Sequence, residues 1–128
     1  MSDAQDKLEL AQRHLERVLD SWDAPTDWSD LYLYGFYCLE DAVEAASLHL
    51  GIQISRSHWK KVEAAARLHN EFGLSSVEQL LVDLNMGRKA AAYGDVEEPD
   101  LDAEEFASRI EQYVDEVEAL LEQDDDTE

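Results

Sequence analysis

The sequence predicts an all-α fold, an antiparallel (up-and-down) bundle of five helices in which a C-terminal helix is added to a four-helix core. Apolar residues recur at steps of three and four in five successive segments, which is the helical period. Glycine, proline and capping residues separate these segments at short intervals. No segment has the two-residue period of a strand. The 128 residues are predicted to form one domain, 1–122, and an acidic, disordered tail, 123–128.

The first helix is predicted from about Asp3 to Trp22. Ser2, with Gln5 three residues later, has the pattern of a capping box that starts a helix. The inward side chains follow at helical spacing: Leu8, Ala11, Leu15, Val18 and Trp22. Pro25 breaks the helix because it has no backbone N–H to donate.

The second helix, from about Asp30 to Gly51, is predicted to be the central one. Asp27 or Ser29 caps its start, and Gly51 ends it. Its first half is apolar on all sides, as expected of a helix that is covered from more than one direction. One face carries mostly small side chains, so a neighbouring helix can come close: Leu31, Gly35, Cys38, Ala42, Ala45, Ala46 and His49.

Three further helices are predicted by the same pattern. The third runs from about Ser57 to Phe72, with Gly73 as its C-cap. The fourth begins at a capping box, either Ser75 with Glu78 or Ser76 with Gln79, and continues to about Tyr93. The fifth follows the acidic loop 94–102, with Asp102 and Glu105 as its box. Its inward side chains are Phe106, Ile110, Tyr113, Val114, Val117 and Leu121.

The charge of the chain argues against a generic nucleic-acid or anionic-membrane surface. Acidic residues number 31 and basic residues 10, a net charge of −21, which repels phosphate groups. Solubility at very high salt explains such an excess, because salt screens the self-repulsion. This charge favours a halophile. The polar N-terminus, the short apolar runs and the single cysteine favour a reducing cytoplasm, with Cys38 a buried small hydrophobe.

The middle of the chain is its only basic part. Residues 56–89 hold six bases against four acids, so an anionic ligand such as a nucleotide is expected there first. Lys61 and Lys89 belong to this segment. No glycine-rich phosphate loop, no Ser-His-Asp pattern and no paired-cysteine spacing is present, so the sequence predicts no cofactor.

Arg88 is the most informative side chain for function. It falls within the apolar stripe of the fourth helix, where a guanidinium must find a carboxylate, a carbonyl group or an anionic ligand. The structural interpretation is a salt bridge to a carboxylate of the second helix, for which the candidates are Glu40, Asp41 and Glu44. The functional interpretation is an anion or nucleotide site, or a contact across a dimer, with Asn85 nearby on the same helix.

Two histidines share a face of the third helix, which raises the question of a metal. His58 and His69 are eleven residues apart, a rise of about 16 Å, whereas a zinc–nitrogen bond is about 2 Å long. They cannot share an ion, and no metal site is predicted. Histidines at the edge of the core that hydrogen-bond a neighbour are the favoured interpretation.

An aromatic patch on the second helix predicts an interface. Leu33, Phe36 and Tyr37 lie opposite its small-residue face. Either the fifth helix covers them within the monomer, or they are exposed and mark a partner. A homodimer through this patch is slightly favoured.

Three stretches of the chain resemble the HEPN domain, a small all-helical family of prokaryotic toxin–antitoxin modules. These are YLYGFYCLEDAVEAASLHLG, SHWKKV and NMGRKAAAYGD. Ribonuclease members of the family carry an arginine and, a few residues later, a histidine at the end of the fourth helix. By this resemblance Arg88 takes the place of the arginine, but Tyr93 stands where the histidine is expected. A phenol with a pKa of about 10 is a poor proton shuttle at neutral pH, where imidazole is suited to the task.

The resemblance and the charge together predict a cytoplasmic, non-catalytic HEPN-like binding or regulatory module. It implies a dimer, a cleft lined by Arg88 and Tyr93, and a nucleotidyltransferase-like protein as partner. One alternative is a ribonuclease toxin that uses Arg88 with Tyr93, or with His58 brought across the bundle. Another is a nucleotide-binding module that uses residues 56–89.

Overall fold

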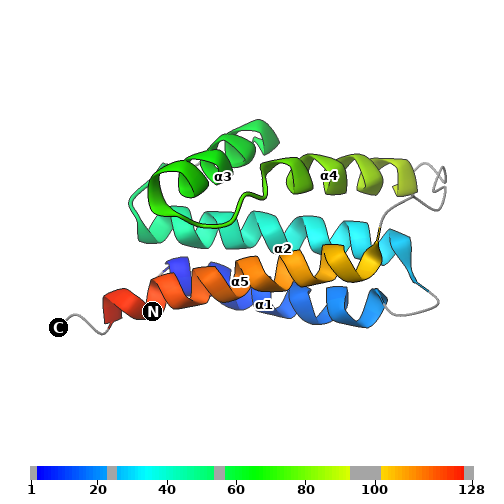
Figure 1. Ribbon diagram of the computed structural model, residues 1–128, viewed down its shortest axis with the longest axis horizontal. Helices are drawn as coiled ribbons and strands as arrows, with labels where there is room; N and C mark the ends of the chain where they lie inside the picture. Colours follow the sequence, from blue (N-terminus) through cyan, green and yellow to red (C-terminus); the bar gives the residue numbers. More distant parts are fainter. Residues whose placement is uncertain (1–2, 23–25, 54–56, 93–101, 126–128) are drawn as a thin grey trace.

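The computed structural model describes residues 3–22, 26–53, 57–92 and 102–125. All regular structure in these ranges is helical, as predicted, and the five helices follow the predicted order (Figure 1). Their bounds are α1 Asp3–Ser21, α2 Trp28–His49, α3 His58–Phe72, α4 Glu78–Ala92 and α5 Ala103–Asp125. Among these helices, none combines the length and the apolar character that a membrane span requires.

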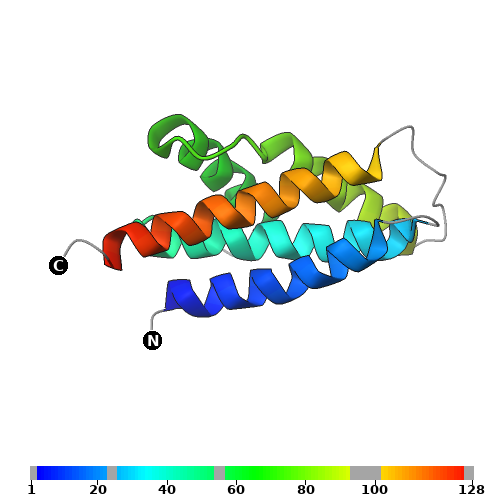
Figure 2. The same ribbon diagram turned by 60° about the horizontal axis from the view of Figure 1, so that its bottom comes forward.

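Helix α2 is the centre of the molecule, which confirms the prediction from its composition. It contacts each of the other four helices, whereas α1 contacts only α2 and α5 among the described elements. Figure 1 shows α2 in the middle, with α5 and α1 on one side and α3 and α4 on the other, and Figure 2 shows α2 between α1 and α3. The small face of α2 explains this arrangement: a β-carbon on Gly35 would lie 3.0 Å from Ile110 Cδ1 of α5 and 3.3 Å from Leu84 Cδ2 of α4.

Helices α1 and α2 form an antiparallel pair. Residues early in α1 contact residues late in α2: Lys7 pairs with Glu44, and the Cys38 thiol donates to the carbonyl of Ala11 over 3.2 Å. Burial raises the pKa of the Cys38 thiol well above its usual range, and the nearby charge of Asp41 adds to the shift. Cys38 is therefore a buried small side chain, as predicted.

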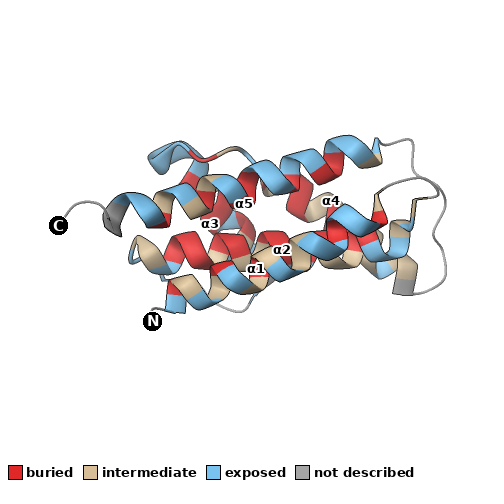
Figure 3. Cartoon of the chain, turned by 90° about the horizontal axis from the view of Figure 1, so that it is seen from below, coloured by how far each residue is buried: buried red, intermediate tan, exposed pale blue. Residues whose placement is uncertain are grey.

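The inward face predicted for the fifth helix is confirmed. Helix α5 lies within the core, and its inward side chains are buried: Phe106, Ala107, Ile110, Tyr113, Val114, Val117 and Leu121. Figure 3 shows the buried stripes of α1, α2 and α5 facing one another. Helix α3 lies on the side of α2 away from α1 and α5, because among the described elements it contacts only α2 and α4. The up-and-down order of all five helices stays a prediction.

Most predicted helix ends are confirmed. The carboxylate of Asp27 accepts the N–H of Asp30 over 3.1 Å at the start of α2, and that of Asp102 accepts the N–H of Glu104 over 3.0 Å at the start of α5. Gly73 takes the left-handed conformation, φ 79°, after α3. Helix α5 continues to Asp125, three residues into the predicted tail. Ser2, Tyr93 and residues 126–128 lie outside the described residues.

The capping box predicted at Ser75 is not formed. Helix α4 begins at Glu78, and both polar groups of Ser75 bind α5 instead. Its N–H and its hydroxyl donate to the two carboxylate oxygens of Glu116, over 2.7 and 2.6 Å. The serine thus joins the segment before α4 to α5, a tertiary contact that a local pattern does not reveal.

Candidate functional site

Arg88 lies on the inward side of α4, where the sequence placed it. Its guanidinium carbon is 4.8 Å from the centroid of the Phe36 ring on α2, the distance of a cation–π contact. Nη2 donates a hydrogen bond of 2.8 Å to the side-chain oxygen of Asn85, one turn earlier on the same helix. Nε is buried and has no acceptor among the described residues. The Arg88 guanidinium is thus positioned by the side-chain amide of Asn85 and by the ring of Phe36.

The three carboxylates expected to pair with Arg88 are used elsewhere, so that expectation was wrong. Lys61 of α3 lies 3.3 Å from Glu40 and 3.2 Å from Glu44, and Lys7 of α1 lies 3.0 Å from Glu44. The third carboxylate, on Asp41, is 2.9 Å from His14 of α1. The physical reason is the register of the helices. Arg88 is level with Phe36, and the carboxylates begin one turn, about 6 Å, further along α2.

The pKa values of Asp41 and Glu44 are shifted in opposite directions, although burial raises both. Burial raises the pKa of Asp41, and the charge of Glu44 adds to the shift, while His14 and Lys7 oppose it. Burial acts on Glu44 in the same direction, but hydrogen bonds from Lys7 and Lys61 outweigh it and hold the pKa of Glu44 below its ordinary value. At neutral pH the ionised Glu44 therefore stabilises the fold, whereas ionisation of Asp41 costs stability.

A continuous series of ring contacts leads from Arg88 across α2 to α1. We call its four rings, Phe36, Tyr37, His14 and Tyr34, the aromatic track. The centroid of Phe36 is 5.9 Å from that of Tyr37, Tyr37 is 5.7 Å from His14, and His14 is 6.2 Å from Tyr34. At the far end Arg17 of α1 places its guanidinium carbon 5.8 Å from the Tyr34 ring. The track thus has an arginine at each end.

The predicted aromatic patch is partly covered within the chain. Phe36 is only 4% exposed, and the side chain stacked on it is Arg88 of α4 rather than a side chain of α5. Tyr37 remains 38% exposed, and Leu33 is half-buried. A homodimer through this patch stays a prediction. Its contacts would come from Leu33 and Tyr37, because Phe36 is part of the core.

The remaining predicted residues are spread along the bundle. Lys61 binds α2 beyond the Arg88 site, and Lys89 is exposed. His58 begins α3, but its side chain is outside the described part, as is all of Tyr93. His69 donates from Nδ1 to the carbonyl of Leu74 over 2.8 Å, which confirms the expectation of a histidine bonded to a neighbour. Within the described ranges no cluster of side chains has the geometry of a metal site.

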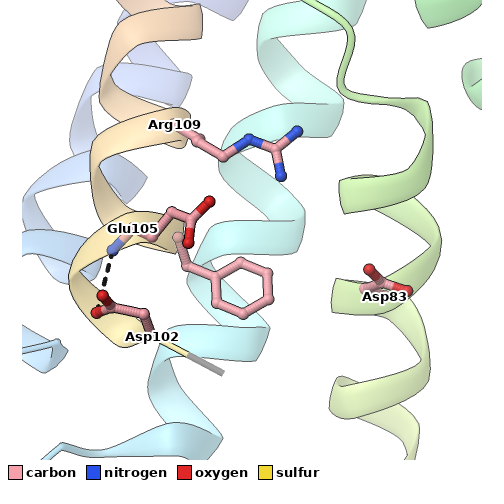
Figure 4. A pocket seen from close by; sticks show the side chains of 5 residues that line it. Asp83, Asp102, Glu105 and Arg109 are labelled. Carbon is pink, nitrogen blue, oxygen red and sulfur yellow. Dashed lines mark hydrogen bonds between the residues drawn. The ribbon is translucent and has the colours of Figure 1, made fainter. Parts of the chain in front are cut away.

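A hollow of about 110 Å³ lies between α4 and α5, away from Arg88. Figure 4 shows Asp83 projecting from α4 on one side of it, with Glu105 and Arg109 of α5 and Asp102, the residue before α5, on the other. Asp102 is occupied as the cap of α5, and the guanidinium of Arg109 donates to the carbonyl of Ser76 over 3.2 Å. The hollow is mainly acidic, and its polar groups serve the local structure of α4 and α5.

The basic segment does not offer free cations along α3. Lys60 is 3.3 Å from Glu63, and Arg67 is 2.5 Å from Glu71, both within the helix. Lys60 and Arg67 line a shallow hollow of about 220 Å³ beside Ile52, but each already has a carboxylate. An anionic ligand at this hollow would have to compete with those pairs.

The sequence analysis did not identify the residues at the α1 end of the aromatic track. His14, Arg17 and Tyr34 carry half of the aromatic track, yet they were not singled out. The signal was present in part, because His14 and Arg17 are three residues apart and therefore share a face of α1. Which side chains of α2 this face would meet depends on the packing of the two helices.

Comparison with known proteins finds no match: no family model, no curated protein and no solved structure corresponds to the chain.

Proposed function

We propose that this protein is a non-catalytic, HEPN-like helical module that binds a partner protein in a halophile-type cytoplasm. The observation that carries the proposal is the state of Arg88, the residue that takes the place of the family's arginine by resemblance. Its ring contact with Phe36 and its hydrogen bond to Asn85 make it part of the packing between α4 and α2. The Arg88 guanidinium therefore already makes contacts within the folded chain before any substrate binds.

The alternative is a ribonuclease toxin, and incubation with RNA separates the two. Purified protein is mixed with total RNA in molar salt, beside Arg88→Ala and beside Lys89→Ala, which removes the neighbouring exposed cation. We expect no difference in RNA integrity among the three proteins. Cleavage that persists in Lys89→Ala and vanishes in Arg88→Ala would defeat the proposal. Circular dichroism of each variant shows whether it is folded.

A nucleotide-binding module is the second alternative. The pairing of Lys60, Lys61 and Arg67 with glutamates speaks against it, because a phosphate would have to displace them. Thermal shift with a panel of nucleotides tests this function. A ligand that binds only the folded state raises the melting temperature once its concentration exceeds the dissociation constant. We expect no shift at millimolar nucleotide.

The resemblance also suggests the kind of partner, a nucleotidyltransferase-like protein beside a toxin–antitoxin module. Co-expression with the product of a neighbouring reading frame of that class, followed by gel filtration, tests it. We expect co-elution. Self-association is the competing mode of binding, and light scattering of the purified chain measures it directly.

A further inference from the structure

A histidine at the surface of α1 is backed by a carboxylate of α2. Nδ1 of His14 lies 2.9 Å from Oδ2 of Asp41. The side chain of His14 is 23% exposed and that of Asp41 is 14% exposed, so the carboxylate is the inner partner of the pair. A hydrogen bond that only joined the two helices would not need the imidazole to reach solvent. The pair therefore presents one side of the imidazole ring to the outside.

The second nitrogen of this ring is a candidate nucleophile. An ionised carboxylate only accepts hydrogen bonds, so Nδ1 of His14 carries the proton toward Asp41 and Nε2 keeps its lone pair. Nε2 makes no hydrogen bond within the described residues, and it is not among their buried atoms that lack a partner, so it is accessible to solvent. Asp41 fixes the tautomer and the orientation of the ring. An imidazole held in this way can form a covalent bond through Nε2.

A guanidinium without a carboxylate partner in the described ranges lies beside His14. Arg17 follows His14 by three residues, so the two share a face of α1. Both also lie against one ring of α2, because the Tyr34 centroid is 5.8 Å from the guanidinium carbon of Arg17 and 6.2 Å from the His14 centroid. The ion pairs of the described residues leave Arg17 out, although the chain has 31 acidic residues. A guanidinium stacked on a ring can still bind an oxyanion through its N–H groups.

An imidazole nucleophile beside an unpaired guanidinium fits a phosphoryl group. Phosphorus is the electrophile that a nitrogen lone pair attacks, and its oxygens are anions that arginine stabilises in phosphoryl transfer. A bound carboxylate would use Arg17 and leave Nε2 of His14 without a role. A metal ion is not favoured, because side chains in the described part of the chain form no cluster that could hold one. Arg17 also offsets, at this place, the repulsion that a net charge of −21 exerts on an anion.

We propose that His14 is a phosphoacceptor that an acyl phosphate phosphorylates on Nε2, with Arg17 binding the phosphoryl oxygens and Asp41 positioning the ring. The inference goes beyond the proposed function, because binding a partner does not require a modified histidine. The RNA test of that function and the test of this residue are independent of each other.

The step balances without an added proton. The Nε2 lone pair of His14 forms a bond to phosphorus while the bond between phosphorus and the acyl oxygen breaks, and the acyl group leaves as a carboxylate. The proton on Nδ1 stays in its hydrogen bond to Asp41, whose negative charge balances the positive imidazolium that forms. A carboxylate leaves without being protonated, so the step needs no general acid.

Incubation of the full chain with acetyl phosphate tests the inference. The salt concentration is one at which circular dichroism shows the chain folded. Mass spectrometry of the intact chain, and of peptides prepared at alkaline pH, counts and locates the phosphoryl groups, because acid cleaves a phosphorus–nitrogen bond and base does not. We expect one phosphoryl group, on His14, and its loss after acid treatment.

His69 is the matched control within the same chain. It is more exposed than His14, but its Nδ1 bonds the backbone carbonyl of Leu74 in place of a carboxylate. Arg67, two residues before it, is already paired with Glu71. We expect His69 to be labelled at least about tenfold more slowly than His14, a difference of one charge-assisted contact.

Two variants separate the roles of the neighbouring groups. Arg17→Gln, at an exposed position, should raise the half-saturating concentration of acetyl phosphate about tenfold, because one charge-assisted hydrogen bond is lost. Asp41→Asn should lower the maximal rate about tenfold and leave that concentration unchanged, because asparagine accepts the Nδ1–H of His14 but cannot balance the imidazolium charge. Arg67→Gln is the control on α3, and we expect no change in either quantity.

Three results would overturn the inference. One is the absence of a phosphoryl group from His14 in the folded chain. Another is equal labelling of His14 and His69, which would reflect the general reactivity of exposed imidazoles. The third is phosphorylation of Arg17→Gln with the rate and the half-saturating concentration of wild type. Arg17→Gln decides alone where circular dichroism shows that Asp41→Asn is not folded.

Discussion

The ring of Tyr32 on α2 fills the space that a side chain at Gly87 of α4 would need. A β-carbon on Gly87 would lie 2.4 Å from Cδ1 of Tyr32 and 2.5 Å from Cε1. The Tyr32 ring also packs against Trp28 of the same helix, with the two ring centroids 5.6 Å apart. This close approach brings α4 onto α2 and sets the next residue, Arg88, over Phe36.

Gly87→Ala should therefore destabilise the fold. Alanine gains about 1 kcal/mol over glycine in a helix, but overpacking against a fixed ring costs about 1–3 kcal/mol. We expect a net loss of up to about 2 kcal/mol in urea denaturation. Met86→Ala, at a neighbouring position 65% exposed, is the control and should change little. In a Tyr32→Ala background the substitution should become neutral or stabilising. A Gly87→Ala protein more stable than wild type would contradict the contact.

Glu44→Gln should reduce stability at neutral pH. The pKa of Glu44 is lowered from 4.5, so its ionised form stabilises the fold above that pH. The contribution is lost as the pH falls through the lowered pKa. We expect Glu44→Gln to lose about 1–2 kcal/mol at pH 7, because hydrogen bonds from Lys7 and Lys61 are weakened. Urea denaturation at a series of pH values measures it. The gap from wild type should narrow below pH 4.5, and a constant gap would count against this explanation.

Asp41→Asn should have the opposite outcome, although the two carboxylates are neighbours. The pKa of Asp41 is raised from 3.8, so the folded state holds its proton more tightly than the unfolded chain does. Ionisation therefore costs stability as the pH rises above 3.8. Asparagine removes that cost and can still accept the hydrogen bond from His14.

We expect the free energy of unfolding of Asp41→Asn at pH 7 to equal or exceed that of wild type. The same urea series measures it, with Glu44→Gln as the reference of opposite sign. A loss of more than about 1 kcal/mol at pH 7 would show that the ionised pair with His14 is net stabilising.

Salt should stabilise this protein strongly. A net charge of −21 on 128 residues repels itself in the folded state, and molar salt shortens the screening length to about 3 Å. We expect the melting temperature, followed by circular dichroism, to rise steeply between low and molar potassium chloride. Each kcal/mol gained corresponds to about 4 °C in a domain of this size. A flat curve would remove the halophile interpretation, and the same titration with an uncharged osmolyte separates screening from general exclusion effects.

Part of the site was visible in the chain before its fold. The helical period placed Arg88 on the inward side of α4, and the structure puts it against a ring of α2. Its partner was predicted wrongly because a period defines the side of a helix that faces inward and says nothing of the register against a neighbour. Glu40 and Phe36 are one turn apart on α2, and that turn decides between a salt bridge and a cation–π contact.

The sequence by itself determined the local features of this protein. Caps at Asp27, Gly73 and Asp102, and the central place of α2, follow from groups within a few residues of one another or from the composition of one helix. Only the tertiary structure decided that Arg88 stacks on Phe36, that Ser75 bonds Glu116, and that rings of α1 and α2 form one track. These features join residues far apart in the chain, so they depend on which helices pack together and at what register, and no local pattern encodes that.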